Sequence, residues 1–173
     1  MEIFVPDMYQ ENIYKINYNN LSSRGIKCLL FDLDNTLGLV KESLPGEECK
    51  KLIKNLKKKG FKILITSNNI RMRVKAYAEE LKVDFISNCR KPHTDKIKEY
   101  IDKSNFGLDE IAIIGDSMLD DVVCGNTIGI TTILLDQLSK IEFPFARLKR
   151  SKEKRIRKKL RDKNLFTKGR YYV

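Results

Sequence analysis

Strand-like and helix-like segments alternate along most of this chain. Short apolar runs typical of strands occupy residues 27–33, 61–66, 83–87, 111–114 and 130–135. Helical patterns lie between them, at residues 46–59, 70–81, 94–104 and 119–127. This order is typical of right-handed β-α-β units with helices on both faces of a sheet. The sequence therefore predicts a Rossmann-like three-layer α/β sandwich around a parallel five-stranded sheet.

The two ends of the chain are less regular than its centre. Pro6 argues against a strand core near the N-terminus, and we predict a short helix at residues 8–15 that packs on the domain. Residues 147–173 contain 13 Lys and Arg against 2 Asp and Glu, whereas residues 1–146 contain 21 of each kind. The net charge of +11 therefore arises in the tail. We divide the chain into a domain at 1–146 and a basic tail at 147–173.

The basic tail is predicted to be a helix with a thin apolar stripe. Its apolar residues Leu148, Ile156 and Leu160 fall near one helical face. A basic amphipathic helix can lie on an anionic membrane surface, bind a nucleic acid backbone or remain solvated. The sequence leaves these alternatives open and favours the membrane over the nucleic acid.

Polar side chains gather where the predicted strands end. Asp32 and Asp34 leave the first strand on the same side, because side chains of extended backbone alternate between faces. Ligands of parallel sheets bind beyond the carboxyl ends of the strands, so we expect the polar residues after the other strands to converge there. These residues are Ser67, Asn68, Lys91, Asp116, Asp120 and Asp121. Several carboxylates beside a hydroxyl group and a lysine suit Mg²⁺ and a phosphate group.

Each of these residues also has a structural interpretation. A turn could start at Asp34, since Asp is a common turn former. Ser67 could cap the helix that follows it, and Lys91 could be an ordinary surface lysine. Asp120 and Asp121 could be acids that favour the dipole at the start of a helix.

Other kinds of site find little support in the sequence. His93 is the single histidine, expected in a solvent-exposed loop, which disfavours a histidine acid–base pair or a catalytic zinc. The four cysteines are scattered, so we expect inert thiols and no disulfide framework. A P-loop is absent. With no apolar run of bilayer length and no signal-peptide pattern, we expect a cytoplasmic protein whose tail is a candidate for peripheral membrane contact.

Four short motifs follow one another at the predicted strand ends. They are D-L-D-N-T at 32–36, T-S-N at 66–68, K-P at 91–92 and G-D-S-M-L-D-D at 115–121. Over residues 28–136 they resemble the haloacid dehalogenase (HAD) superfamily, subfamily IIIA, of aspartate-nucleophile phosphatases. F-V-P-D-M-Y at 4–9, the pattern from Gly115 to Asn126 and the basic tail are similar to the YqeG-type subgroup. That subgroup is related to phosphatidylglycerophosphate phosphatases.

The resemblance implies a role for each motif residue. Asp32 would attack the phosphorus atom and form an aspartyl-phosphate. Asp34 would protonate the leaving oxygen and then activate the water that hydrolyses the intermediate. Ser67 and Lys91 would bind phosphate oxygens. The full set of phosphate-binding candidates is Asn35, Thr36, Ser67, Asn68 and Lys91.

Mg²⁺ is the cofactor that the resemblance implies. Its ligands would be Asp32, the main-chain carbonyl group of Asp34, Asp116 and one further carboxylate acting through water. Many relatives place this further acid four positions after the first, at Asp120, but alignment through Gly129 favours Asp121.

We therefore predict a Mg²⁺-dependent phosphomonoesterase that acts on phosphatidylglycerophosphate or a similar phosphorylated substrate. The segments between the motifs are too short for a cap domain, so the predicted site suits a large substrate or closure by a partner subunit. Two alternatives remain. One is a phosphatase of a soluble sugar or nucleotide phosphate. The other is an RNA- or ribosome-binding accessory protein with a vestigial site, against which the intact Asp32, Asp34, Lys91 and Asp116 argue.

Overall fold

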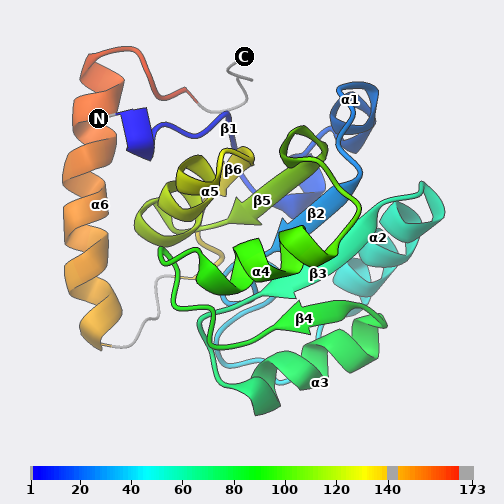
Figure 1. The fold of residues 1–173 in the computed structure, drawn as a ribbon. Coiled ribbons are helices and arrows are strands. Elements are labelled where there is room, and N and C mark those ends of the chain that lie inside the picture. Colours follow the sequence, from blue (N-terminus) through cyan, green and yellow to red (C-terminus); the bar gives the residue numbers. More distant parts are fainter. Residues whose placement is uncertain (1, 140–143, 168–173) are drawn as a thin grey trace.

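A parallel sheet forms the centre of the molecule (Figure 1). The computed structural model describes residues 2–139 and 144–167, with the backbone only for residues 144–147. Within these residues the sheet has six strands in the order β1-β6-β5-β2-β3-β4. The strands are β1 (Met8–Gln10), β2 (Cys28–Phe31), β3 (Lys62–Thr66), β4 (Asp84–Ile86), β5 (Ile111–Gly115) and β6 (Thr131–Leu135). Every neighbouring pair is parallel, which confirms the predicted α/β class with one strand more than expected.

Helices cover both faces of this sheet (Figure 1). The helices are α1 (Tyr18–Ser23), α2 (Glu47–Lys58), α3 (Arg71–Leu81), α4 (Asp95–Lys103), α5 (Val123–Ile128) and α6 (Pro144–Asp162). Short turns add η1 (Glu2–Phe4), η2 (Ile13–Lys15), η3 (Leu108–Glu110) and the π-helical η4 (Met118–Val122). Apolar residues of α1, α2 and α3 pack on one face of the sheet, and those of α4 and α5 pack on the other. The predicted three-layer sandwich is confirmed.

The central strand shows why two helical layers are needed. Leu29 and Phe31 of β2 belong to the core beneath α2 and α3, whereas Cys28 and Leu30 belong to the core beneath α4 and α5. All four side chains are fully buried. A strand with apolar side chains on both faces is stable only between two covering layers, so the run C-L-L-F places β2 in the middle of the sheet.

The predicted N-terminal helix at residues 8–15 is wrong. Met8–Gln10 form the edge strand β1, which pairs with β6 through the register Met8 to Ile133. Pro6 precedes the strand, where its missing N–H group interrupts no ladder hydrogen bond. Asp7 anchors the pairing, because its Oδ2 atom accepts a 2.7 Å hydrogen bond from the backbone N–H group of Thr132. The helical turns nearest to this strand are η1 before it and η2 and α1 after it.

The connections from β2 to β3 and from β3 to β4 are too short to contain a cap domain. A loop and α2 connect β2 to β3, and α3 alone lies between β3 and β4. The absence of a cap domain between these strands, all of whose connecting residues are described, agrees with the prediction. Among the described helices, none has both the length and the apolar character needed to cross a membrane.

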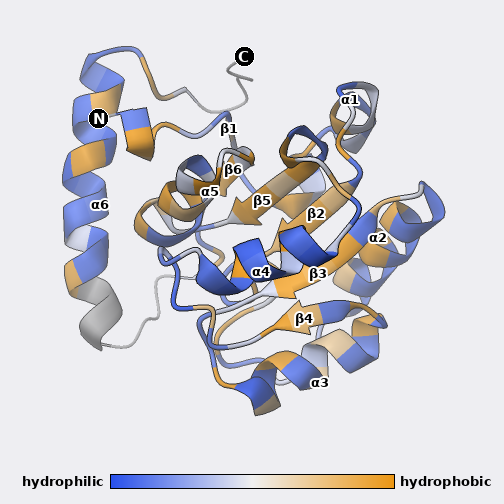
Figure 2. Cartoon of the chain, viewed as in Figure 1, coloured by the Kyte–Doolittle hydropathy of each residue, from blue (hydrophilic) through white to orange (hydrophobic). Residues whose placement is uncertain are grey.

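Much of the basic tail lies in the long helix α6, which packs beside η4 and shares an apolar cluster with Phe4 of η1 (Figure 1). Leu160 is fully buried and belongs to an apolar cluster with Tyr9, Met118 and Phe166, on which Ile156 also packs. The rest of the helix is largely hydrophilic (Figure 2). The division at residue 146 stays a prediction, and residues 168–173 of the predicted tail lie outside the described residues, as do residues 1 and 140–143.

The predicted apolar stripe of α6 is only partly correct. Leu148 is 81 % exposed, whereas Ile156 and Leu160 face the domain. Residues of an α-helix are about 100° apart, so eight residues place Leu148 about 80° away from Ile156. The difference is large enough to turn Leu148 towards solvent. The face that packs on the domain instead includes a buried acid, Glu153, which is 2 % exposed.

Candidate active site

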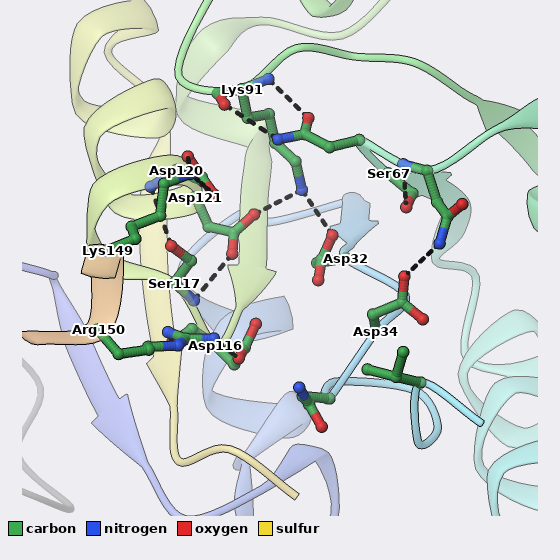
Figure 3. Close-up of a pocket in the computed structure, with 14 residues that line it drawn as sticks. Asp32, Asp34, Ser67, Lys91, Asp116, Ser117, Asp120, Asp121, Lys149 and Arg150 are labelled. Carbon is green, nitrogen blue, oxygen red and sulfur yellow. Dashed lines mark hydrogen bonds and ion pairs between the residues drawn. The ribbon is translucent and has the colours of Figure 1, made fainter. Parts of the chain in front are cut away.

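A pocket of about 490 Å³ lies at the carboxyl ends of β2, β3 and β5. Its walls carry almost every predicted site residue: Asp32, Asp34, Asn35, Ser67, Asn68, Lys91, Asp116, Asp120 and Asp121. Figure 3 shows the carboxylates and the lysine pointing towards one another from these strand ends. The convergence that the β-α-β pattern predicted is therefore present.

Asp32 and Asp34 follow β2 directly. The backbone N–H group of Asp32 donates a 2.8 Å hydrogen bond to the carbonyl group of Ile114, which extends the pairing of β2 with β5. At Asp34 a tight turn begins, closed by a 2.8 Å hydrogen bond from the N–H group of Asn35 to the carbonyl group of Gly38. The turn and the site thus coexist at Asp34, because the turn directs the chain away while the carboxylate remains on the pocket wall.

Lys91 is the centre of the polar network. Its side chain is 1 % exposed, which rules out the surface-lysine interpretation. The ammonium group donates to Asp32 Oδ1 at 2.8 Å, to Asp121 Oδ1 at 2.5 Å and to the carbonyl group of Thr66 at 2.7 Å. These three acceptors match the three protons of an ammonium group. Lys91 therefore fixes two carboxylates and the end of β3 at one point.

Asn68 holds Lys91 in place through the backbone. Its side-chain Oδ1 atom accepts a 2.7 Å hydrogen bond from the N–H group of Lys91, and its Nδ2 atom donates a 3.0 Å bond to the carbonyl group of Lys91. The amide of Asn68 is therefore engaged with the chain around Lys91. In this structure Asn68 positions the lysine.

Three carboxylates lie close enough to share one metal ion. Asp32, Asp116 and Asp121 each offer an oxygen atom, and these atoms lie within 4.8 Å of one another. Burial raises the pKa of Asp116 to about 7, although Arg150 beside it acts in the opposite direction. Burial also raises the pKa of Asp32 well above its usual range, with Lys91 opposing and the two neighbouring carboxylates adding to the rise. Clustered carboxylate oxygen atoms are hard donors, which suit a divalent cation.

The charge of Lys91 depends on the same carboxylates. Burial by itself lowers the pKa of an amine, but Asp121 and Asp32 overcome this effect and raise the pKa of Lys91 above its usual value. Lys91 therefore remains an ammonium ion. Lys91 pairs with Asp32 and Asp121, and Arg150 pairs with both Asp116 and Glu153. These two cations face four carboxylates, so the cluster retains a deficit of positive charge that a divalent cation would supply.

Asp121 and Asp120 occupy different places. Asp121 is 2 % exposed, and its Oδ2 atom accepts a 3.1 Å hydrogen bond from the N–H group of Ser117. A Cβ atom on Gly115 would collide with the Asp121 carboxyl group, so only glycine allows this approach to the strand end. Asp120 lies outside the three-carboxylate cluster, and its two oxygen atoms both accept from Lys149. The geometry favours Asp121 for the metal, and that role stays a prediction.

Asp34 is held from the opposite wall. Arg73, in the first turns of α3, donates to Asp34 Oδ1 from Nε at 2.9 Å and from Nη2 at 2.6 Å. Asn69 donates to Asp34 Oδ2 at 2.9 Å. The sequence reasoning missed Arg73. The sequence did contain a signal for it. Arg73 stands near the N-terminus of a predicted helix, where the helix dipole disfavours positive charge, so its position there needed an explanation.

The remaining predicted phosphate-binding residues differ in their positions. Ser67 is 2 % exposed and lines the pocket; its hydroxyl group accepts a 3.1 Å hydrogen bond from Asn69 and does not cap α3, which starts after Ile70. Asn35 also lines the pocket, and its Oδ1 atom is buried without a hydrogen-bond partner among the described residues. Thr36 is buried but absent from the pocket wall, so the structure does not bring it to the site.

α6 adds three residues that the sequence reasoning missed. Lys149 and Arg150 line the pocket; Arg150 forms an ion pair with Asp116 and donates a 3.0 Å hydrogen bond to the Asp116 carbonyl group. Glu153 accepts from the Ser117 hydroxyl group at 2.8 Å and from the N–H group of Leu119 at 3.0 Å. In the sequence, Glu153 stands out as an acid within a long run of cations, and this contrast could have drawn attention to it.

The residues that were expected to be inert have the expected positions. His93 lies in an exposed loop. The four cysteines are buried and free, and burial raises the pKa of each thiol. Protonated thiols are poor nucleophiles and poor metal ligands, so the chemistry of the described residues concentrates on the carboxylates.

Several known proteins resemble this chain over most of its length. Residues 1–139 match the family model described as mitochondrial PGP phosphatase. A Bacillus subtilis (strain 168) protein described as "Probable phosphatase YqeG" is 32 % identical over 164 residues, which span 94 % of each chain. Phosphatidylglycerophosphate phosphatase 1 of Arabidopsis thaliana is 26 % identical over 163 residues, covering 83 % of this chain and 44 % of that protein.

Solved structures with low sequence identity share the fold. A haloacid dehalogenase-like hydrolase from Bacteroides fragilis superimposes with a TM-score of 0.52 and 16 % identity, over 62 % of this chain and 86 % of that chain. The cobalt-bound deoxy-D-mannose-octulosonate 8-phosphate phosphatase of Haemophilus influenzae gives 0.51 and 14 %, over 66 % and 80 %. From the family match and the relatives, we conclude that the chain belongs to the PGP phosphatase family and is a phosphatase whose fold is shared with a haloacid dehalogenase-like hydrolase.

Proposed function

We propose that this protein hydrolyses a phosphomonoester through an aspartyl-phosphate on Asp32, with Mg²⁺ as cofactor. The observation that carries the proposal is the buried network in which Lys91 joins Asp32 to Asp121 beside Asp116. In it the Asp32 carboxylate is oriented at a strand end by the ammonium group of Lys91, which lines the same pocket. Such an arrangement stabilises the negative charge that develops during phosphoryl transfer.

Each residue contributes a separate part of the reaction. Lys91 binds one oxygen atom of Asp32, so the second oxygen atom is the one that attacks the phosphorus atom. The Ser67 hydroxyl group and the ammonium group of Lys91 bind phosphate oxygens. Asp34 gives a proton to the leaving oxygen and later takes one from the water that attacks the aspartyl-phosphate. Arg73 and Asn69 keep the Asp34 carboxyl group oriented between the two steps.

The cofactor assignment follows from the donor set. Asp32, Asp116 and Asp121 supply oxygen atoms, which suit Mg²⁺ better than they suit softer metals. When bound there, Mg²⁺ would neutralise charge on the phosphate and bring it close to Asp32. The Asp34 main-chain carbonyl group is the further ligand that the motif order implies.

Phosphatidylglycerophosphate, or a closely similar phospholipid, is the proposed substrate. Support comes from the family match over residues 1–139 and from the Arabidopsis relative, whose name states this activity. The outward side of α6 is consistent with a lipid-bound substrate, since Arg155, Lys158 and Lys159 are exposed there beside Leu148. Such a face is attracted to an anionic membrane surface.

The test is phosphate release in the presence and absence of Mg²⁺. Substrates are phosphatidylglycerophosphate in mixed micelles, sugar phosphates, nucleotides and an aryl phosphate. We expect Mg²⁺-dependent release from the lipid, abolished in Asp32→Asn and retained in Asp102→Asn, a matched change of an exposed acid on α4. Release from sugar phosphates or nucleotides alone would overturn the lipid assignment. No release from any substrate by folded protein at saturating Mg²⁺ would overturn the enzyme reaction itself.

A further inference from the structure

We propose that Lys149 and Arg150 of α6 form a second anion-binding position at this pocket, so that preferred substrates carry a second negative group close to the phosphomonoester. The inference rests on the proposed phosphatase function and deepens it. It assigns a specificity-determining role to two residues that lie outside the four motifs and more than twenty residues beyond the last of them.

Lys91, Arg73, Lys149 and Arg150 differ in their exposure. Lys91 is 1 % exposed and Arg73 is 16 % exposed, and both are engaged with the carboxylates after β2. Lys149 and Arg150 come from α6 instead, with side chains 42 % and 21 % exposed, and they line the same pocket. Lys91 is therefore buried at the inner end of the pocket, whereas the two cations of α6, labelled in Figure 3, are more exposed.

Lys149 lies within reach of a ligand that enters the pocket. Its Nζ atom lies 2.7 Å from both oxygen atoms of Asp120, which is outside the three-carboxylate cluster. The side chain of Lys149 is 42 % exposed and that of Asp120 is 15 % exposed, so the ammonium group lies on the solvent side of this pair. A phosphate or phosphodiester group that enters the pocket can therefore take over the ammonium group from Asp120.

Arg150 is fixed more firmly. Its Nη1 atom donates to Glu153 Oε2 at 2.7 Å and to the Asp116 carbonyl group at 3.0 Å. Its Nη2 atom pairs with the Asp116 carboxylate. The planar guanidinium group is thus oriented before a ligand arrives, and its positive charge stays at the pocket wall, where it attracts an anion. Binding to such a preorganised group costs little conformational entropy.

The attachment of α6 makes this position part of the folded domain. Glu153 binds the start of η4 through Ser117 and Leu119. Further along the same helix, the side chain of Leu160 is fully buried. Two separate contacts, one polar and one apolar, therefore hold the segment that carries Lys149 and Arg150. A floppy tail would present the same charges without a defined distance to Asp32.

The shape and charge of the pocket define a class of substrates. Its volume of about 490 Å³ exceeds what one phosphate group requires and falls in the range of small-molecule sites. Phosphatidylglycerophosphate has this chemistry, because a phosphodiester group stands three carbon atoms away from its terminal phosphate. Glycerol 3-phosphate has the same terminal phosphate and lacks the second anion, so the two compounds isolate the contribution of α6.

The first arm of the test measures kcat/KM for two soluble probes, the deacylated head group of phosphatidylglycerophosphate and glycerol 3-phosphate. We expect wild type to prefer the head group, and Lys149→Gln to reduce the ratio of the two kcat/KM values about tenfold, mainly through KM, as for a lost hydrogen bond to a charged group. Lys154→Gln, which removes another exposed cation of α6, should leave the ratio unchanged. An unchanged ratio in Lys149→Gln would overturn the proposal.

The second arm measures binding without turnover. Calorimetric titration measures the affinity of Asp32→Asn for the head group and for inorganic phosphate. The same titrations are repeated with Lys149→Gln added to Asp32→Asn. We expect Lys149→Gln to weaken head-group binding about tenfold and inorganic phosphate binding less than twofold. An equal loss for both ligands would show a general electrostatic effect and overturn the second position. Because this arm needs no catalysis, its result stands even if the proposed reaction fails.

Discussion

Replacement of Lys91 by methionine is the most severe single test of the buried network. Lys91→Met keeps most of the side-chain length and apolar volume but removes the ammonium group. Asp32 and Asp121 then lose their shared partner, and the carbonyl group of Thr66 loses a 2.7 Å hydrogen bond. All of these groups lie in a region where the Lys91 side chain is 1 % exposed, so water does not replace the lost contacts readily.

The expected magnitude follows from that burial. Removal of one partner from a buried ion pair typically costs about 3–5 kcal/mol, because an uncompensated charge remains. For a domain of this size about 1 kcal/mol corresponds to roughly 2–4 °C in Tm. We therefore expect Lys91→Met to lower the Tm by roughly 6–20 °C in metal-free buffer. The variant should also lose phosphatase activity.

Thermal and urea unfolding followed by circular dichroism measure this loss, with a chelator present so that metal binding does not compensate. The matched control is Lys103→Met, which removes an exposed ion pair to Glu99 whose partners are 73 % and 64 % exposed. That control should change stability by less than about 0.5 kcal/mol. If Lys91→Met were as stable as the control, the reasoning that Lys91 compensates the buried carboxylates would be refuted.

Three further predictions address the metal, the strand end and α6. Mg²⁺ at about 100 times its Kd should stabilise wild type by about 2.7 kcal/mol and leave Asp116→Asn nearly unaffected; equal thermal shifts would exclude Asp116 as a ligand. Gly115→Ala should lower kcat by about 10²-fold, because the added methyl group displaces the Asp121 carboxyl group; an unchanged kcat would show that this carboxylate need not lie there. Leu160→Ala should destabilise the protein by about 2–5 kcal/mol in chemical unfolding. The exposed Leu148→Ala should remain within about 0.5 kcal/mol, and equal effects would contradict the packing of α6.

The part of the fold that the sequence predicts is the part with strong local periodicity. The apolar run before Asp32 reports burial on both faces, and the alternation with helices restricts the topology to parallel β-α-β units. Once the strands are parallel, Ser67, Lys91 and Asp116 must meet at one edge. The inner half of the site is therefore accessible from the sequence.

The N-terminal strand is not accessible in this way. β1 has only three residues, too few for an alternating pattern to stand out from the polar sequence around it. Its position depends on the exposed edge of β6 and on the bond from Asp7 to Thr132. Both are tertiary contacts, which no local pattern reports.

The contribution of α6 was missed for a related reason. A run of lysine and arginine predicts a solvated or polyanion-binding face, and nothing local distinguishes Lys149 and Arg150 from their neighbours. Their partners, Asp120 and Asp116, lie about thirty residues earlier in the chain. Glu153 was the one local indication, because an acid among so many cations suggests a specific partner elsewhere in the fold.

The most direct test of the central claim is to trap the covalent intermediate. Wild-type protein is mixed with ³²P-labelled substrate and Mg²⁺, and the reaction is quenched in acid within milliseconds. Peptide mass spectrometry then identifies the labelled peptide. The account predicts one hydroxylamine-sensitive phosphoryl group on the peptide that contains Asp32, absent in Asp32→Asn. A phosphoryl group on another residue, or substrate turnover by Asp32→Asn at the wild-type rate, would contradict it.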